Sequence, residues 1–156
     1  MEQLLQYFIR QPTNDQALTT RLQSYEGDTE YKTLEWKSDA FATLLRDAGC
    51  RRGDRIGCMT EKMSSALISM LGIMKAGCVC VPVQSHYNRE QIRSVMLETD
   101  SRWLLSDESV SEQVDPSLFE TGEISLGWLG DADTLPDDVV AEFVFKNIDQ
   151  YAARLI

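Results

Sequence analysis

The sequence predicts an α/β fold, in which a parallel, Rossmann-like sheet is flanked by helices. Two observations at the centre of the chain carry this prediction. Residues 63–74 place apolar side chains at helical spacing, and a short apolar run at residues 78–83 follows at once. A third observation is that helix-like and strand-like segments alternate from residue 34 to residue 106, as they do when helices connect parallel strands. With 156 residues, 43% of them apolar, the chain can form one domain or one lobe of a larger one.

The N-terminal part is predicted to hold a helix and a β-hairpin. Residues 2–9 have the pattern of a short amphipathic helix, which ends at Pro12 and the polar residues after it. Residues 17–25 and 30–33 have the character of two strands about a polar turn at residues 26–28. We therefore expect an N-terminal β-hairpin ahead of the sheet.

The alternating region begins with a helix and a strand. Residues 34–48 carry apolar side chains on one helical face, and Gly49 is expected to end this helix. Residues 55–59 form a strand candidate that contains Gly57. A glycine inside a strand indicates that another segment or a ligand approaches closely, and close packing is the commoner cause.

The central helix and strand follow. Gly77 is expected to end the helix, because a residue without Cβ adopts the left-handed conformation past a helix end most easily. The run at residues 78–83 is apolar at nearly every position, which predicts a strand buried on both faces. The helix face expected to point inward consists of Met63, Ala66, Leu67, Met70, Leu71 and Met74.

A third helix and strand complete the alternation. Asn88 and Gln91 have the spacing of a capping box, so a helix is predicted to begin here. Residues 102–106 are predicted to be the next strand. The inner face of the helix is expected to consist of Ile92, Val95 and Met96.

The patterns are weaker beyond Asp107. Residues 109–119 suggest a short helix interrupted by Pro116, and residues 123–129 suggest a strand. Residues 131–138 are acidic and are expected to form a loop. We assign the whole chain, residues 1–156, to a single α/β unit.

The charge and the cysteines exclude several classes of partner. The net charge of −10 argues against nucleic acid and against an anionic membrane surface, which both require a basic footprint. No apolar stretch is long enough for a membrane span, and the N-terminus has no signal-peptide pattern, so we expect a cytoplasmic protein. The four cysteines form no C-x-x-C pair, and buried, reduced thiols are the expected state.

No residue of the sequence is assigned a catalytic, cofactor-binding or metal-binding role. No G-x-G-x-x-G follows a strand, and Cys78 stands after Gly77 where a phosphate-binding loop requires lysine. His86, the one histidine, is placed in the loop after the central strand, where a catalytic base could act. A loop histidine with no identified nucleophile is more often a surface or packing residue. A Ser-His-Asp triad stays open but has no G-x-S-x-G motif to support it.

Four pieces of sequence between residues 31 and 107 stand in a recognisable order. They are Tyr31 and Leu34 with the helix to Gly49, the sequence RGDRI at 52–56, LGIMKAG at 71–77 with VPV at 81–83, and residues 87–92 with LLSD at 104–107. Together they resemble the N-terminal part of the adenylate-forming superfamily, which includes acyl-CoA synthetases, luciferases and the adenylation domains of nonribosomal peptide synthetases. Glu30 and Thr33 depart from this family, which usually has Thr and Glu at these positions.

The resemblance implies a sub-lobe of a larger adenylation domain. The family activates a carboxylate with ATP and Mg to give an acyl adenylate, which a thiol then captures. Its phosphate loop is expected to follow Ile156, and its catalytic lysine belongs to a further C-terminal domain. The resemblance therefore implies that the chain binds no cofactor by itself, is inactive alone, and acts as scaffold for the remainder of the domain.

Two other interpretations stay open. The chain could be a stand-alone, non-catalytic interaction module that pairs with itself or another protein at an open sheet edge, with the acidic segment after Asp107 as contact surface. An independent nucleotide-binding Rossmann protein is the third possibility, and the missing phosphate-binding glycines count against it.

Overall fold

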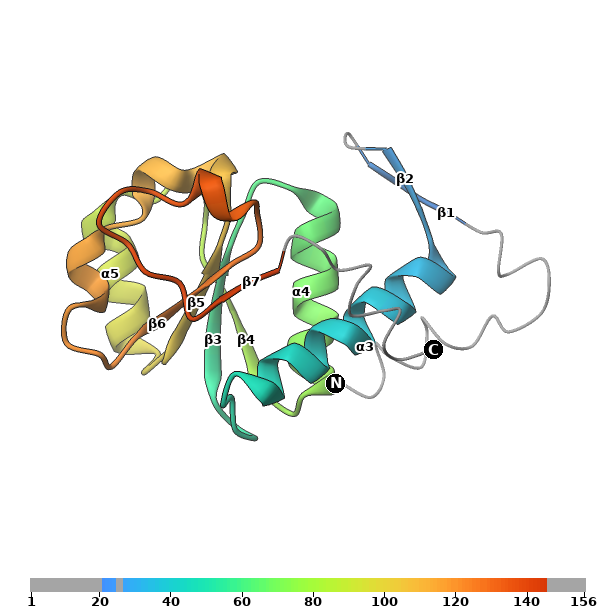
Figure 1. Cartoon of the computed structure of the whole chain (residues 1–156), viewed down its shortest axis with the longest axis horizontal. Helices are drawn as coiled ribbons and strands as arrows, with labels where there is room; N and C mark the ends of the chain where they lie inside the picture. The colour runs from blue at the N-terminus through green and yellow to red at the C-terminus, as the bar shows by residue number, and fades with distance from the viewer. Residues whose placement is uncertain (1–20, 25–26, 146–156) are drawn as a thin grey trace.

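The computed structural model of the chain describes residues 21–24 and 27–145. Its centre is a five-stranded sheet in the order β4-β3-β5-β6-β7, in which all neighbouring strands are parallel (Figure 1). This confirms the predicted fold class. The helix predicted at residues 2–9 lies outside the described residues. The strands are β3 (Arg55–Met59), β4 (Val79–Pro82), β5 (Trp103–Ser106), β6 (Ser125–Trp128) and β7 (Phe143–Val144).

Helices cover both faces of the sheet (Figure 1). Helices α3 (Tyr31–Asp47) and α4 (Met63–Lys75) lie side by side on one face, and α5 (Arg89–Glu98) lies on the other. Because successive side chains of a strand point to opposite faces, Leu105 packs against α3 and α4, whereas Leu104 packs on the side of α5. The core is therefore divided into two apolar layers by the sheet.

The N-terminal hairpin is confirmed, with different bounds. Strand β1 (Arg21–Ser24) pairs antiparallel with β2 (Gly27–Glu30), and Figure 1 shows this pair extending from the start of α3. The predicted bounds, with a turn at residues 26–28 and a second strand at residues 30–33, were wrong. Gly27 and Asp28 belong to β2, and residues 31–33 already form the first turn of α3, so the helix pattern extends three residues further toward the N-terminus than the apolar spacing alone indicates.

Both glycines predicted to end helices do so. Gly49 and Gly77 have positive φ angles of 102° and 80°, which favour a residue without Cβ. After Gly77 the backbone N–H of Cys78 donates to the carbonyl of Ile73 at 3.0 Å, five residues back, which is the Schellman arrangement. The reversal turns the chain directly from α4 into β4.

The inward face of α4 differs from the predicted one. Met63, at the edge of the predicted face, is 50% exposed, whereas Ile68 and Gly72 on the other side are buried. The reason is that α4 packs against the sheet and against α3 together, and the close contact with α3 requires a small residue. A Cβ added to Gly72 would lie 2.6 Å from Cδ1 of Phe41 in α3. Apolar residues occur all around α4, so their spacing alone does not identify the buried side.

A polar anchor strengthens the contact between α3 and α4. The ammonium of Lys75 is nearly buried and donates to Ser38 Oγ at 2.6 Å and to the carboxylate of Asp39 at 2.7 Å. In the other direction, the guanidinium of Arg46 donates to the carbonyl of Lys75 at 2.7 Å. Lys75 therefore serves packing within the lobe, because its charge is paired at the helix interface.

Strand β4 was predicted to be buried on both faces, and this prediction was wrong. It is the outermost strand of the sheet, and Val79 is 43% exposed. Val79 and Val83 donate to carbonyls of β3 and its flank, so alternation turns the N–H of Cys80 and the nitrogen of Pro82 to the open side. An apolar run of this kind is shared by central and edge strands, and the proline is the residue that distinguishes an edge.

The capping box at the start of α5 is confirmed. The side chain of Asn88 accepts from the backbone of Gln91 at 2.8 Å, and the side chain of Gln91 accepts from the backbone of Asn88 at 2.9 Å. Ile92 and Met96 are buried on the inner face as predicted. A Cβ at Gly57 would lie 2.9 Å from Sδ of Met96, so close packing explains this strand glycine.

The C-terminal part is more irregular than the predicted short helix. Residues 109–119 form two 3₁₀ turns, η1 (Glu108–Gln113) and η2 (Pro116–Phe119), each begun by an aspartate that accepts from a backbone N–H. Strand β6 confirms the strand predicted at residues 123–129. Strand β7 and the short 3₁₀ turn η3 (Ala132–Thr134) were not predicted. None of the helices in the described part of the chain is long and apolar enough to cross a lipid bilayer.

Candidate functional site

The carboxyl ends of β3 and β5 form the position where an open parallel sheet binds ligands. The connection after β3 leads to β4, which lies on one side of this strand pair. The connection after β5 leads to β6, which lies on the other side, so the two connections diverge. Thr60 and Lys62 follow β3, and Asp107 and Glu108 follow β5. The chemistry of this edge depends on whether these polar groups are available.

Asp107 is fully buried, and its carboxylate is occupied. One oxygen accepts from the hydroxyl of Thr60 at 2.5 Å, and the other accepts from the backbone N–H of Ser109 at 3.0 Å and from its hydroxyl at 2.5 Å. A buried carboxylate requires such donors, because polar atoms buried without hydrogen-bond partners cost free energy. Asp107 thus joins the end of β3 to the turn after β5, and this arrangement is structural.

An ion pair between Lys62 and Glu108 makes the second connection between the two loops. The hydrogen bond to Glu108 raises the pKa of Lys62. Burial alone would raise the pKa of Glu108, but the hydrogen bond and the charge of Lys62, together with a backbone hydrogen bond, outweigh burial, and the pKa lies below its usual value. Both groups are therefore held in their charged forms, and neither is poised to exchange a proton near neutral pH.

His86 lies in the loop after β4 and is exposed. Its ring contacts the ring of Tyr87 in an edge-on arrangement, with centroids 5.1 Å apart. Within the described residues no nucleophile is hydrogen-bonded to this imidazole, and the geometry matches the surface role that the sequence favours. We assign no catalytic function to His86.

The cysteines are free thiols in apolar surroundings. Burial raises the pKa of Cys58 to about 12 and, with the proximity of Cys78, that of Cys50 to about 12. A thiol whose pKa is raised in this way is a poor nucleophile near neutral pH. In the described part of the chain, no three side chains of His, Cys, Asp or Glu converge as metal ligands would.

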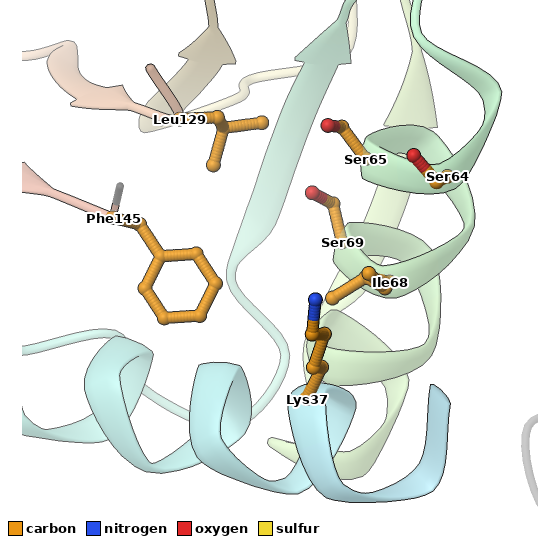
Figure 2. A pocket seen from close by; sticks show the side chains of 7 residues that line it. All are labelled: Lys37, Ser64, Ser65, Ile68, Ser69, Leu129 and Phe145. Carbon is orange, nitrogen blue, oxygen red and sulfur yellow. The ribbon is translucent and has the colours of Figure 1, made fainter. Parts of the chain in front are cut away.

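A cavity of about 190 Å³ opens at the same edge of the sheet, on the side of α3 and α4 (Figure 2). Lys37 reaches it from α3, and serines of the first two turns of α4 face it from the right in Figure 2. Apolar side chains after β6 and β7 close the opposite wall. The described lining residues are Lys37, Ser64, Ser65, Ile68, Ser69, Leu129 and Phe145.

This cavity was missed by reasoning from the sequence, because its residues come from four separate elements. The signal that could have indicated it is the pair Ser64 and Ser65, which stands at the first turn of a helix directly after a parallel strand. Ligands of an open parallel sheet bind outside the carboxyl ends of its strands, so polar side chains at this position are candidates for contact with a ligand. Leu129 and Phe145 carry no such signal, since β7 itself was not predicted.

Comparisons with known proteins agree with this architecture. The AMP-binding enzyme family matches residues 6–150. A nonribosomal peptide synthetase of Gibberella zeae is 33% identical over 124 residues, which is 80% of this chain and 2% of that protein. Surfactin synthase subunit 2 of Bacillus subtilis is 27% identical over 111 residues, which is 71% of this chain and 3% of that protein.

Solved structures show the same fold at lower identity. A benzoate CoA ligase from Burkholderia xenovorans is similar with a TM-score of 0.72 and 17% identity, over 95% of this chain and 27% of that one. ATP-bound MatB from Rhodopseudomonas palustris has a TM-score of 0.69 and 20% identity, over 94% of this chain and 27% of that one. The chain thus spans a few per cent of the synthetases and about a quarter of the solved chains. Because the family match covers nearly its whole length, the chain belongs to the AMP-binding enzyme family, as an N-terminal part of the adenylate-forming superfamily.

Proposed function

We propose that this chain is the N-terminal scaffold lobe of an adenylate-forming ligase that activates a carboxylate with ATP and Mg and transfers the acyl group to a thiol. The observation that carries the proposal is the family match over residues 6–150, on a parallel sheet that solved CoA ligases share. The relatives are peptide synthetases and CoA ligases, which have carboxylate activation in common. One solved relative is described with ATP bound, which supports ATP as the co-substrate.

The geometry of the lobe supports a scaffold role. At the edge where an active site would form, Asp107 and Glu108 are engaged by Thr60, Ser109 and Lys62. Adenylation requires cations and donors directed at the developing phosphate charge. We infer that the residues performing this chemistry belong to the remainder of the adenylation domain, which is also the partner of this lobe. Use of ATP and four free thiols support a cytoplasmic location.

The alternative, an interaction module that pairs through an open sheet edge, has weaker support than the scaffold proposal, as the outer edge of β4 shows. β4 offers a partner strand only one outward N–H, that of Cys80, because Pro82 has none. An edge with so few donors is poorly suited to strand addition. The remaining argument for this alternative is the exposure of Val79 on the same strand.

Two assays test the scaffold proposal. ATP–pyrophosphate exchange is measured with the purified chain and a panel of carboxylic acids, and no exchange above a buffer blank is expected. In a chimera, residues 31–145 replace the structurally matching segment of the Burkholderia benzoate CoA ligase, and benzoyl-CoA formation is expected to persist. Exchange by the isolated chain would show that it is itself an enzyme. A folded chimera that binds no ATP would contradict the assignment as a lobe of this family.

Sizing of the purified chain tests the alternative. The scaffold proposal expects no stable self-association through β4, so a Val79→Lys variant should elute as the unmodified chain does. A dimer that Val79→Lys dissociates would favour the interaction module instead.

A further inference from the structure

We propose that the cavity between α3, α4 and the ends of β6 and β7 binds a small organic anion. The acidic group of this ligand lies against Lys37 and the serine hydroxyls of α4, and the apolar part of the ligand lies against Leu129 and Phe145. This inference goes beyond the scaffold role proposed above, and none of the described lining residues takes part in the connections between Thr60, Lys62, Asp107 and Glu108.

The charge of the lining residues selects an anion. The chain carries a net charge of −10, yet no Asp or Glu is among the described residues that line this cavity, and Lys37 is. Three other cavities on the described part of the chain are each lined by at least one carboxylate. Within the described part of the chain Lys37 also has no carboxylate partner, unlike Lys62 and Lys75. Its charge is therefore available to a ligand.

Hydroxyl groups converge on the same space. Figure 2 shows Ser65 and Ser69 directed toward the wall formed by Leu129 and Phe145, with the amine of Lys37 below them. Ser69 is 2% exposed, and its hydroxyl also contacts the thiol of Cys58 in the neighbouring strand. Hydroxyl and ammonium donors together are suited to an oxyanion, because charge-assisted hydrogen bonds are the stronger kind.

The opposite wall determines that the ligand has an apolar part. Leu129 is half-buried and Phe145 is packed against Phe41, with ring centroids 4.6 Å apart, so the wall is a preformed apolar surface. The volume of about 190 Å³ corresponds to roughly six water molecules at ~30 Å³ each, which accommodates one aromatic ring with one acidic group. An inorganic anion would leave this wall in contact with water. The class of ligand is therefore an aromatic or branched carboxylate or phosphate monoester.

Binding to the purified full chain tests this proposal, in the absence of ATP. Benzoate and phenyl phosphate are the two acidic probes, inorganic phosphate lacks the apolar part, and benzamide lacks the charge. Titration followed by amide and methyl NMR shifts is expected to give saturable binding of one or both acidic probes, at least about tenfold tighter than benzamide and inorganic phosphate. The tighter of the two acidic probes identifies the acidic group that the site prefers.

Variants localise the binding. Lys37→Met is expected to weaken the tighter probe about tenfold, and Ser69→Ala several-fold. Lys32→Met is the matched control, because it removes the same charge from the same helix. The ammonium of Lys32 lies 4.5 Å from the centroid of the Trp36 ring, and Lys32 is not among the described residues that line the cavity. Lys32→Met should leave the affinity unchanged, and thermal melts verify that all three variants are folded.

Several results would overturn the proposal. These are no saturable binding of either acidic probe, benzamide binding as tightly as benzoate, and equal effects of Lys37→Met and Lys32→Met. If Lys37→Met does not fold, the test rests on Ser69→Ala and on the NMR shifts that the acidic probe causes in the unmodified chain. Weaker binding by Ser69→Ala, with shifts confined to residues around Ser65 and Phe145, would support the site. Shifts elsewhere in the chain would reject it. Failure of these titrations leaves the pyrophosphate-exchange and chimera results unaffected, so the two proposals fail separately.

Discussion

Replacement of Gly72 by alanine tests how α3 and α4 are packed. In an open helix the change would stabilise the protein by about 1 kcal/mol, because alanine has the higher helix propensity. Here the new Cβ would lie 2.6 Å from Cδ1 and 3.0 Å from Cβ of Phe41, where carbon atoms in contact are normally about 3.5–4.0 Å apart. Phe41 is fully buried and cannot turn away. Overpacking of this kind costs about 1–3 kcal/mol, so the net effect should be a destabilisation of about 1 kcal/mol.

Urea denaturation followed by circular dichroism measures this change. Gly72→Ala is expected to lower the midpoint at an unchanged slope, and in a thermal melt to lower Tm by about 2–4 °C. Phe41→Leu is the partner variant. In the Phe41→Leu protein the methyl group that Gly72→Ala adds has room, so the double variant should lose less unfolding free energy than the sum of the two single variants. An increase in stability for Gly72→Ala, or strict additivity of the pair, would refute the contact between these residues.

Three further changes test other parts of the lobe. Ile68→Asp is expected to cost several kcal/mol or prevent folding, because it buries an unpaired charge, whereas Met63→Asp on the opposite side of the helix should cost less than about 1 kcal/mol, as thermal melts would show. Asn88→Ala removes the capping box and should cost about 0.5–2 kcal/mol in urea denaturation. Because burial raises the pKa of Cys50 and Cys58 from 9.0 to about 12, the folded state retains these protons at higher pH than the unfolded state. Stability should therefore fall as the pH rises from 9 toward 12, and Cys→Ala replacement at both positions should flatten that dependence.

The sequence predicted well those elements whose signals are local. The start of α5 depends on the pair Asn88 and Gln91, three residues apart, and the structure contains both hydrogen bonds. Gly49 and Gly77 end their helices because a left-handed backbone favours glycine at any helix end, whatever surrounds it. These features require no knowledge of the tertiary contacts.

The errors arose where tertiary contacts decide between local alternatives. α4 is apolar on more than one side, and tertiary contacts such as that of Gly72 with Phe41 determine which side is buried. β4 has the composition of a central strand, and its edge position follows from where β3 and β5 pair. β7 consists of Phe143 and Val144, too short for any period to appear. Each of these depends on residues distant in the sequence.

The candidate site combines both cases. Its polar groups were visible in the sequence as ordinary residues, such as Ser65 on α4 and Lys37 on α3, but their convergence depends on the packing of α3 against α4. We expect the same packing contact, between Gly72 and Phe41, to position Phe145 through the contact of the Phe41 and Phe145 rings, which are tilted by 43°. A change that shifts Phe41 should therefore displace both the helix that carries Lys37 and the apolar wall that faces it. Gly72→Ala is thus expected to weaken anion binding as well as stability, although Gly72 does not line the cavity. If Gly72→Ala lowered stability and left the affinity for the acidic probe unchanged, the cavity would be independent of the helix contact, and Phe145 would be positioned by the sheet alone.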